Sequence, residues 1–164
     1  MVSKKIEEAL NQQLNAELYS SYLYLSMAAQ FEADNLSGMA HWMAAQAKEE
    51  WEHGMKFYSF LHDRGGRVVL KQIDTPPVEW SRPLAAFEEA YKHEQLVTSK
   101  INALMDLAIK ESDYATKEFL GWFVSEQVEE EANVSKIVER LKLLGDSKNG
   151  LFMMDHELAK RAAD

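Results

Sequence analysis

Apolar residues recur at steps of three, four and seven along four long segments of the chain, which is the spacing of one face of an α-helix. In the second segment, Met43, Ala47, Gly54, Phe57 and Leu61 share such a face. A shorter segment with a similar pattern follows at the end of the chain. The pattern predicts helices at residues 3–34, 37–64, 83–110 and 114–144, and a short fifth helix at 149–162.

Residues at the ends of these segments suit helix starts and stops. Ser3 and Ser37 are placed to cap the first two helices, because a serine hydroxyl accepts a hydrogen bond from a free backbone N–H group. Gly145 is placed to end the fourth helix, and Asn149 or Gly150 lies near the start of the fifth.

The connections indicate how the helices are arranged. Short loops join the first helix to the second and the third to the fourth, so each pair is predicted to be antiparallel. The connection at residues 65–82 contains Gly-Gly and Pro-Pro, and when extended it reaches about 60 Å, more than a helix of about 40 Å. Helices two and three can therefore run parallel. We predict one all-α domain over residues 1–164, a four-helix bundle with one long crossover connection plus a short C-terminal fifth helix.

One glutamate interrupts each of the four apolar faces. Glu17, Glu50, Glu94 and Glu130 lie about 11 to 17 residues from the starts of their helices, so all four reach the middle of the bundle. A single such glutamate is more often a surface residue on a misdrawn face. Four at one level indicate a site, because a buried carboxylate is costly unless it is neutralised or paired.

Two divalent cations would balance four carboxylates. His53 and Gln127, each three residues from one of the glutamates, would add neutral ligands on the same helix faces. Carboxylate-rich sites suit Fe(II) and Mn(II). We assign one ion to Glu17, Glu50 and His53, and a second to Glu50, Glu94 and Glu130, with Gln127 assisting or positioning oxygen or water.

Several further polar residues leave two interpretations open. Tyr24, two turns after Glu17, is either a packing residue or a group that hydrogen-bonds a ligand carboxylate or supplies an electron. Glu49, Glu126 and Glu129 form either a solvated acidic face or a looser cation site beside the first. The remaining histidines, His41, His62, His93 and His156, are assigned no role, since they lie near helix ends or point away from the four glutamates.

Composition narrows the classes of function. The chain has no cysteine, which excludes disulfides and thiolate chemistry, and its net charge of -9 disfavours nucleic acid or an anionic membrane as a partner. Neither a signal peptide nor an apolar span of about 20 residues is visible, so we expect a cytoplasmic protein. The chain has more large apolar side chains than the interior of one bundle requires, which predicts contacts between subunits. These side chains are Tyr19, Tyr22, Trp42, Trp80, Leu151 and Phe152.

Four motifs in order resemble those of a known family. They are NAELYSSYLY, AKEEWEHGMKFYSFLHDRGG, YKHEQLVTSKIN and FVSEQVEEE, and GLFMMDHEL matches the family's short fifth helix. Over essentially its full length the chain resembles a bacterial non-haem ferritin subunit. The related bacterioferritins place a haem-ligating Met directly after the first bridging glutamate, where this chain has Trp51, so no haem is expected.

The resemblance implies a ferroxidase centre that binds two iron ions, formed by Glu17, Glu50, His53, Glu94, Gln127 and Glu130, with Tyr24 nearby. It also implies a third iron site, formed by Glu49, Glu126, Glu129 and the shared Glu130, and assembly into a 24-subunit shell. The implied function is iron storage and detoxification, in which Fe(II) is oxidised by O2 or hydrogen peroxide and mineralised inside the shell. Two alternatives remain: a small di-iron oxidase or peroxidase that retains its metals, and a non-catalytic helical interaction module.

Overall fold

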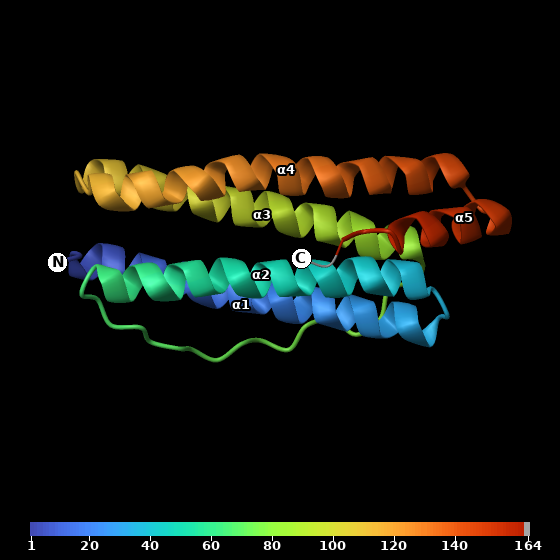
Figure 1. The fold of residues 1–164 in the computed structure, drawn as a ribbon, viewed down its shortest axis with the longest axis horizontal. Helices are drawn as coiled ribbons and strands as arrows, with labels where there is room; N and C mark the ends of the chain where they lie inside the picture. Colours follow the sequence, from blue (N-terminus) through green and yellow to red (C-terminus); the bar gives the residue numbers. More distant parts are fainter. Residues whose placement is uncertain (163–164) are drawn as a thin grey trace.

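The computed structural model describes residues 1–162, and its regular structure consists of helices (Figure 1). Their bounds are α1 Lys4–Ala33, α2 Ser37–Asp63, α3 Pro83–Lys110, α4 Tyr114–Leu144 and α5 Lys148–Leu158. The prediction of an all-α four-helix bundle with one long crossover and a short fifth helix is confirmed. In the described part of the chain, no helix is both long and apolar enough to cross a bilayer.

The four long helices pair as the loop lengths predict. α1 lies antiparallel to α2, and α3 lies antiparallel to α4 (Figure 1). The crossover returns along the length of the bundle beside α1 and α2, so that α2 and α3 run in the same direction. Close backbone contacts join α1 to α2, α3 to α4 and α1 to α3, whereas no Cα atom of α2 comes within 8 Å of one in α4. α2 and α4 are therefore joined through side chains, as where Phe57 packs on Phe123.

The helix caps agree with the sequence at one predicted serine and differ at the other. Ser3 caps α1, with its hydroxyl accepting a hydrogen bond from the Ile6 N–H at 3.3 Å. The prediction for Ser37 is wrong, since the N-cap of α2 is Leu36 and Ser37 is already helical. The reason is the tight end of α1, where Asn35 takes a φ of 60° and the Leu36 N–H donates to the Phe31 carbonyl at 2.9 Å.

The fifth helix is shorter than predicted. It begins after Ser147, whose hydroxyl accepts from the Gly150 N–H at 3.0 Å, and it ends at Leu158 rather than at residue 162. After Leu158 the chain continues beside α2 (Figure 1), where the Arg161 guanidinium lies over the Trp42 ring and donates to the Trp42 carbonyl.

Two apolar clusters fill the bundle, one on each side of its middle. The first lies where α5 covers the bundle and includes Phe31 and Phe87, and the second includes Phe57 and Phe123 near the other end. Trp42 and Trp80, predicted as surplus apolar surface, are instead buried in the first cluster. Tyr19 and Leu151 are partly buried against it, whereas Tyr22 and Phe152 are 50% and 76% exposed.

Candidate metal centre

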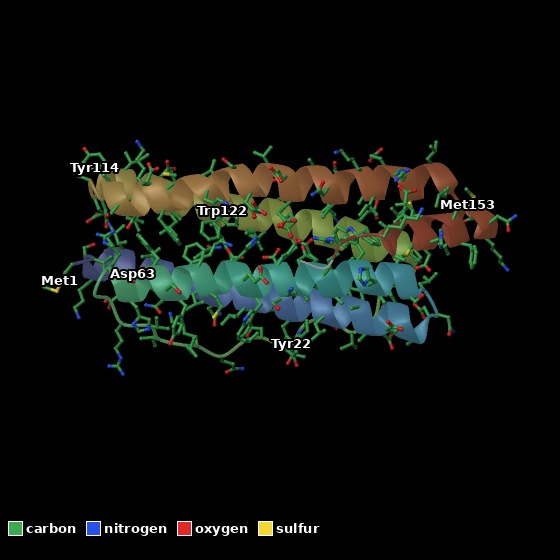
Figure 2. The ribbon with its side chains drawn as sticks, in the orientation of Figure 1. Met1, Tyr22, Asp63, Tyr114, Trp122 and Met153 are labelled. Atoms are coloured by element: carbon green, nitrogen blue, oxygen red, sulfur yellow. The ribbon has the colours of Figure 1, made fainter. Side chains whose placement is uncertain are left out.

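The middle of the bundle, between the two apolar clusters, is polar. The four glutamates predicted from the interrupted faces are all buried there, with exposures of 0–4%, and each comes from a different long helix. His53 and Gln127 are buried beside them. Trp122, labelled between α4 and α2 in Figure 2, lies at the same level, since its ring centroid is 5.3 Å from that of His53.

The ligand atoms of these side chains form two groups that share one residue. Glu17, Glu50 and His53 each offer an atom within 4.8 Å of the others, and so do Glu50, Glu94 and Glu130. Within the first group, His53 Nδ1 lies 3.4 Å from Glu50 Oε2. Glu50 is therefore placed to contact two ions at once, the arrangement assigned to it from the sequence.

Without a cation the four carboxyls cannot all ionise at neutral pH. Burial, and then repulsion by Glu50, raises the pKa of Glu17 to about 8. Burial likewise raises the pKa of Glu130 to about 8 and that of Glu94 to about 7. The pKa of Glu50 is raised well above its usual value by burial and by the charges of Glu94 and Glu130. Bound divalent cations would offset these shifts, because a nearby positive charge favours the ionised carboxylate.

Two glutamine amides hold the carboxylates in place, and the sequence analysis missed both. Gln13 Nε2 donates to Glu17 Oε1 at 2.7 Å, and Gln46 Nε2 donates to Glu50 Oε1 at 3.0 Å and to Glu130 Oε2 at 2.8 Å. Each glutamine lies four residues before a site glutamate, a repeated spacing that could have identified them. Among the described residues, Glu17 Oε2 and Gln46 Oε1 are buried without a hydrogen-bond partner, so the site retains unused ligand atoms.

Glu94 is oriented from two sides. The Tyr24 hydroxyl donates to Glu94 Oε1, and Gln127 Nε2 donates to Glu94 Oε2 at 3.2 Å. Burial, followed by the charge of Glu94, raises the pKa of Tyr24 well above its usual value, so the phenol stays neutral and can donate. Of the alternatives for Tyr24, hydrogen bonding to a candidate ligand is what the structure supports.

His93, to which the sequence analysis assigned no role, packs against Tyr24. It is partly buried, and its Nε2 lies 2.7 Å from the Ser20 hydroxyl oxygen. Its ring meets that of Tyr24 edge-on at a centroid distance of 5.9 Å. Burial, and then the charge of Lys100, lowers the pKa of His93 to about 4, so the imidazole is neutral. We assign it a packing role beside Tyr24.

The residues of the expected third site are only partly brought together. Glu126 Oε1 lies 3.8 Å from His53 Nε2, and His53, Glu126 and Glu130 form a further group of mutually close ligand atoms. Glu49 and Glu129 line the same cavity, which has a volume of about 490 Å³, but neither belongs to such a group among the described residues. Glu49 instead forms an ion pair with Arg161.

Comparisons with known proteins agree with this geometry. Residues 7–144 match the family model described as a ferritin-like domain. The chain is 44% identical to a bacterial non-heme ferritin of Bacteroides fragilis, over 98% of this chain and 100% of that protein. It is 42% identical to one of Staphylococcus saprophyticus, over 100% and 98%.

Solved structures give the same result. The open-pore ferritin of Archaeoglobus fulgidus superimposes with a TM-score of 0.97 at 51% identity, covering 98% of each chain. A closed form of that ferritin engineered by mutagenesis gives a TM-score of 0.99 at 49% identity over 100% of both chains. The superposition includes the whole bundle and the crossover connection.

Proposed function

Because this chain belongs to the ferritin family, we propose that its buried carboxylates bind Fe(II) as a substrate, oxidise it and pass it on for storage. The observation that supports this proposal best is the pair of ligand groups that share Glu50. Two Fe(II) ions bring a charge of +4, which matches four ionised glutamates. Their arrival displaces the protons that burial otherwise keeps on these carboxyls.

The chemical step needs two electrons, and two neighbouring ions supply them. One Fe(II) lies with Glu17, Glu50 and His53, and the other with Glu50, Glu94 and Glu130, while Gln127 and Tyr24 hold Glu94. Each Fe(II) loses one electron and becomes Fe(III). The two electrons and two protons convert O2 to hydrogen peroxide, or convert hydrogen peroxide to two molecules of water.

Storage requires the product to leave, and further ligands of the same kind lie next to the site. One imidazole serves two ions and the remaining ligands are oxygen atoms, so Fe(III), a hard cation, can exchange them for other carboxylate oxygens. The cavity beside Glu126 and Glu130 offers Fe(III) acidic side chains outside the core. We propose that Glu49, Glu126 and Glu129, with Glu130, form a third iron site there and that mineral grows inside a 24-subunit shell.

An aerobic Fe(II) titration combined with particle sizing tests this function. A large shell that oxidises many irons per subunit, with a fast phase that saturates at two, supports storage. A small particle whose oxidation stops at two irons supports a di-iron oxidase that retains its metals. No oxidation above the rate in buffer supports a helical interaction module.

A further inference from the structure

The segment that follows α5 ends in a set of contacts centred on Arg161. Its guanidinium lies over the Trp42 ring, 4.4 Å from the centroid, and donates to the Trp42 carbonyl at 3.3 Å. Its backbone carbonyl lies 2.8 Å from His41 Nε2. Its second terminal nitrogen donates to Glu49 Oε2 at 2.5 Å. The first three contacts attach the segment to α2, and the fourth binds a carboxylate of the proposed third site.

The position of this ion pair matters because Glu49 directly precedes the shared glutamate Glu50 on α2. Arg161 and Glu49 line the same cavity as Glu126, Glu129 and Glu130. The side chains of Arg161 and Glu49 are 18% and 35% exposed, so the pair is partly shielded from water. Glu49 is directed to the guanidinium, while Glu126 is directed to His53.

We propose that Arg161 is a positioning residue that competes with iron for Glu49. A guanidinium and a divalent ion beside one carboxylate repel each other, so an ion that uses Glu49 must displace Arg161. Binding of the third ion is then coupled to docking of the segment at residues 159–162, and each weakens the other. This inference rests on the proposed function, since it concerns iron at the carboxylates next to the oxidation site.

The competition predicts the order in which the three metal sites fill as the Fe(II) concentration rises. The two core groups contain no basic side chain other than His53, so they load first. The third site loads only at higher Fe(II) concentration, once Arg161 has been displaced. Iron supply would therefore decide whether the third site takes part.

Anaerobic Zn(II) titration of the assembled protein, followed by calorimetry, tests the competition with a redox-inert ion. In Arg161→Gln the third ion should bind about tenfold tighter than in the wild type, because one charge-assisted hydrogen bond no longer opposes it. The first two ions should bind unchanged. Arg161→Lys, which keeps the charge, should restore most of the competition.

Arg140→Gln is the matched control. Arg140 lines the same cavity but pairs with Glu157 of α5, so its loss removes the same charge without freeing Glu49. If Arg161→Gln and Arg140→Gln bind the third ion equally, or if Arg161→Gln gains no third ion, the competition is refuted.

Tryptophan fluorescence gives a readout that a purely structural Arg161 would not change. Displacement of the guanidinium from Trp42 should alter emission as the third Zn(II) binds, and both Trp42→Phe and Arg161→Gln should lose that change. Emission that responds equally in all three proteins would contradict the proposal. A wild type that binds fewer than two ions, or does not oxidise Fe(II), would instead refute the proposed function itself.

Discussion

The apolar ends of the bundle and its polar middle are equally buried, but only the middle contains ionisable groups that burial makes costly to charge. At the ends, aromatic rings pack directly on one another, as in Phe31 with Phe87 at a centroid distance of 5.8 Å and Phe57 with Phe123 at 4.4 Å. In the middle, four carboxyls lie together with raised pKa values and unpartnered ligand atoms. The ends are complete within the subunit, whereas the carboxyls of the middle can all ionise at neutral pH only if positive charge is supplied.

This difference predicts that stability and metal binding can be changed separately. A change in an apolar cluster should lower the free energy of unfolding whether or not metal is present. A change among the carboxylates should mainly affect metal binding, oxidation and the pH dependence of stability.

Phe87→Ala should have the largest effect on stability. Phe87 is fully buried and packs on Phe31 and Trp42, so truncation removes apolar contacts and leaves a cavity that costs about 3–5 kcal/mol. Denaturant unfolding of the metal-free protein measures this loss in the free energy of unfolding. Leu143→Ala is the control, because Leu143 is 88% exposed. If Phe87→Ala weakened Zn(II) binding as strongly as it lowered stability, the two regions would not be separable.

Glu50→Ala should have the largest effect on oxidation. It removes the side chain shared by both ligand groups, so the initial rate at two Fe(II) per subunit should fall by at least about a hundredfold. Glu52→Ala controls for the lost charge, since Glu52 is exposed on the same helix and only pairs with Lys48 at 3.9 Å. An unchanged initial rate in Glu50→Ala would refute the assignment of the shared ligand.

The raised pKa values predict how stability depends on pH. Glu17 has an ordinary pKa of 4.5 and a folded pKa of about 8, so between these values the folded protein holds a proton that the unfolded chain has lost. Glu130 behaves likewise. Their contribution to stability is full below pH 4.5 and is lost as the pH rises through about 8.

Melting temperatures of the metal-free protein at several pH values measure this dependence. Stability should fall from pH 5 to pH 8, and Glu17→Gln should fall less steeply. Saturation with Zn(II) should remove the decline and release roughly three protons per subunit near pH 7, which an indicator dye records. A metal-free protein that gains stability over this range, with no proton release on Zn(II) binding, would contradict the account of the middle region.

Gln46→Leu should have the smallest of these effects. The change removes the amide that donates to Glu50 and Glu130 but leaves every proposed ligand, so the affinity for Zn(II) should fall by about tenfold. Gln30→Leu is a matched control, because Gln30 binds the crossover at Trp80 rather than the site. Equal affinity in Gln46→Leu and the wild type would show that Gln46 does not position the carboxylates.

The parts of this account that follow from periodicity could be predicted from the sequence. The bundle and the burial of Glu17, Glu50, Glu94 and Glu130 follow from which face of a regular helix each residue occupies. Gln13 and Gln46 lie on the same faces, but an uncharged amide is cheaper to bury than a carboxylate and so stands out less. Gln127 was identified only because it lies three residues before Glu130.

The remaining features depend on segments without periodicity. The burial of Trp80 depends on the path of the crossover, where its backbone N–H donates to Gln30 Oε1 at 2.7 Å. The pairing of Arg161 with Glu49 depends on the turn after α5 and joins residues far apart in the chain. His93 belongs to none of the groups of close ligand atoms among the described residues, and its partial burial depends on how closely α1 and α3 pack.

Anomalous scattering from crystals soaked anaerobically in Fe(II) tests the central claim most directly. Two iron peaks should appear in the middle of each subunit, one contacted by Glu17, Glu50 and His53 and the other by Glu50, Glu94 and Glu130. Crystals that bind iron elsewhere, while these carboxylates stay free of any peak, would contradict the claim that divalent ions complete the bundle's middle.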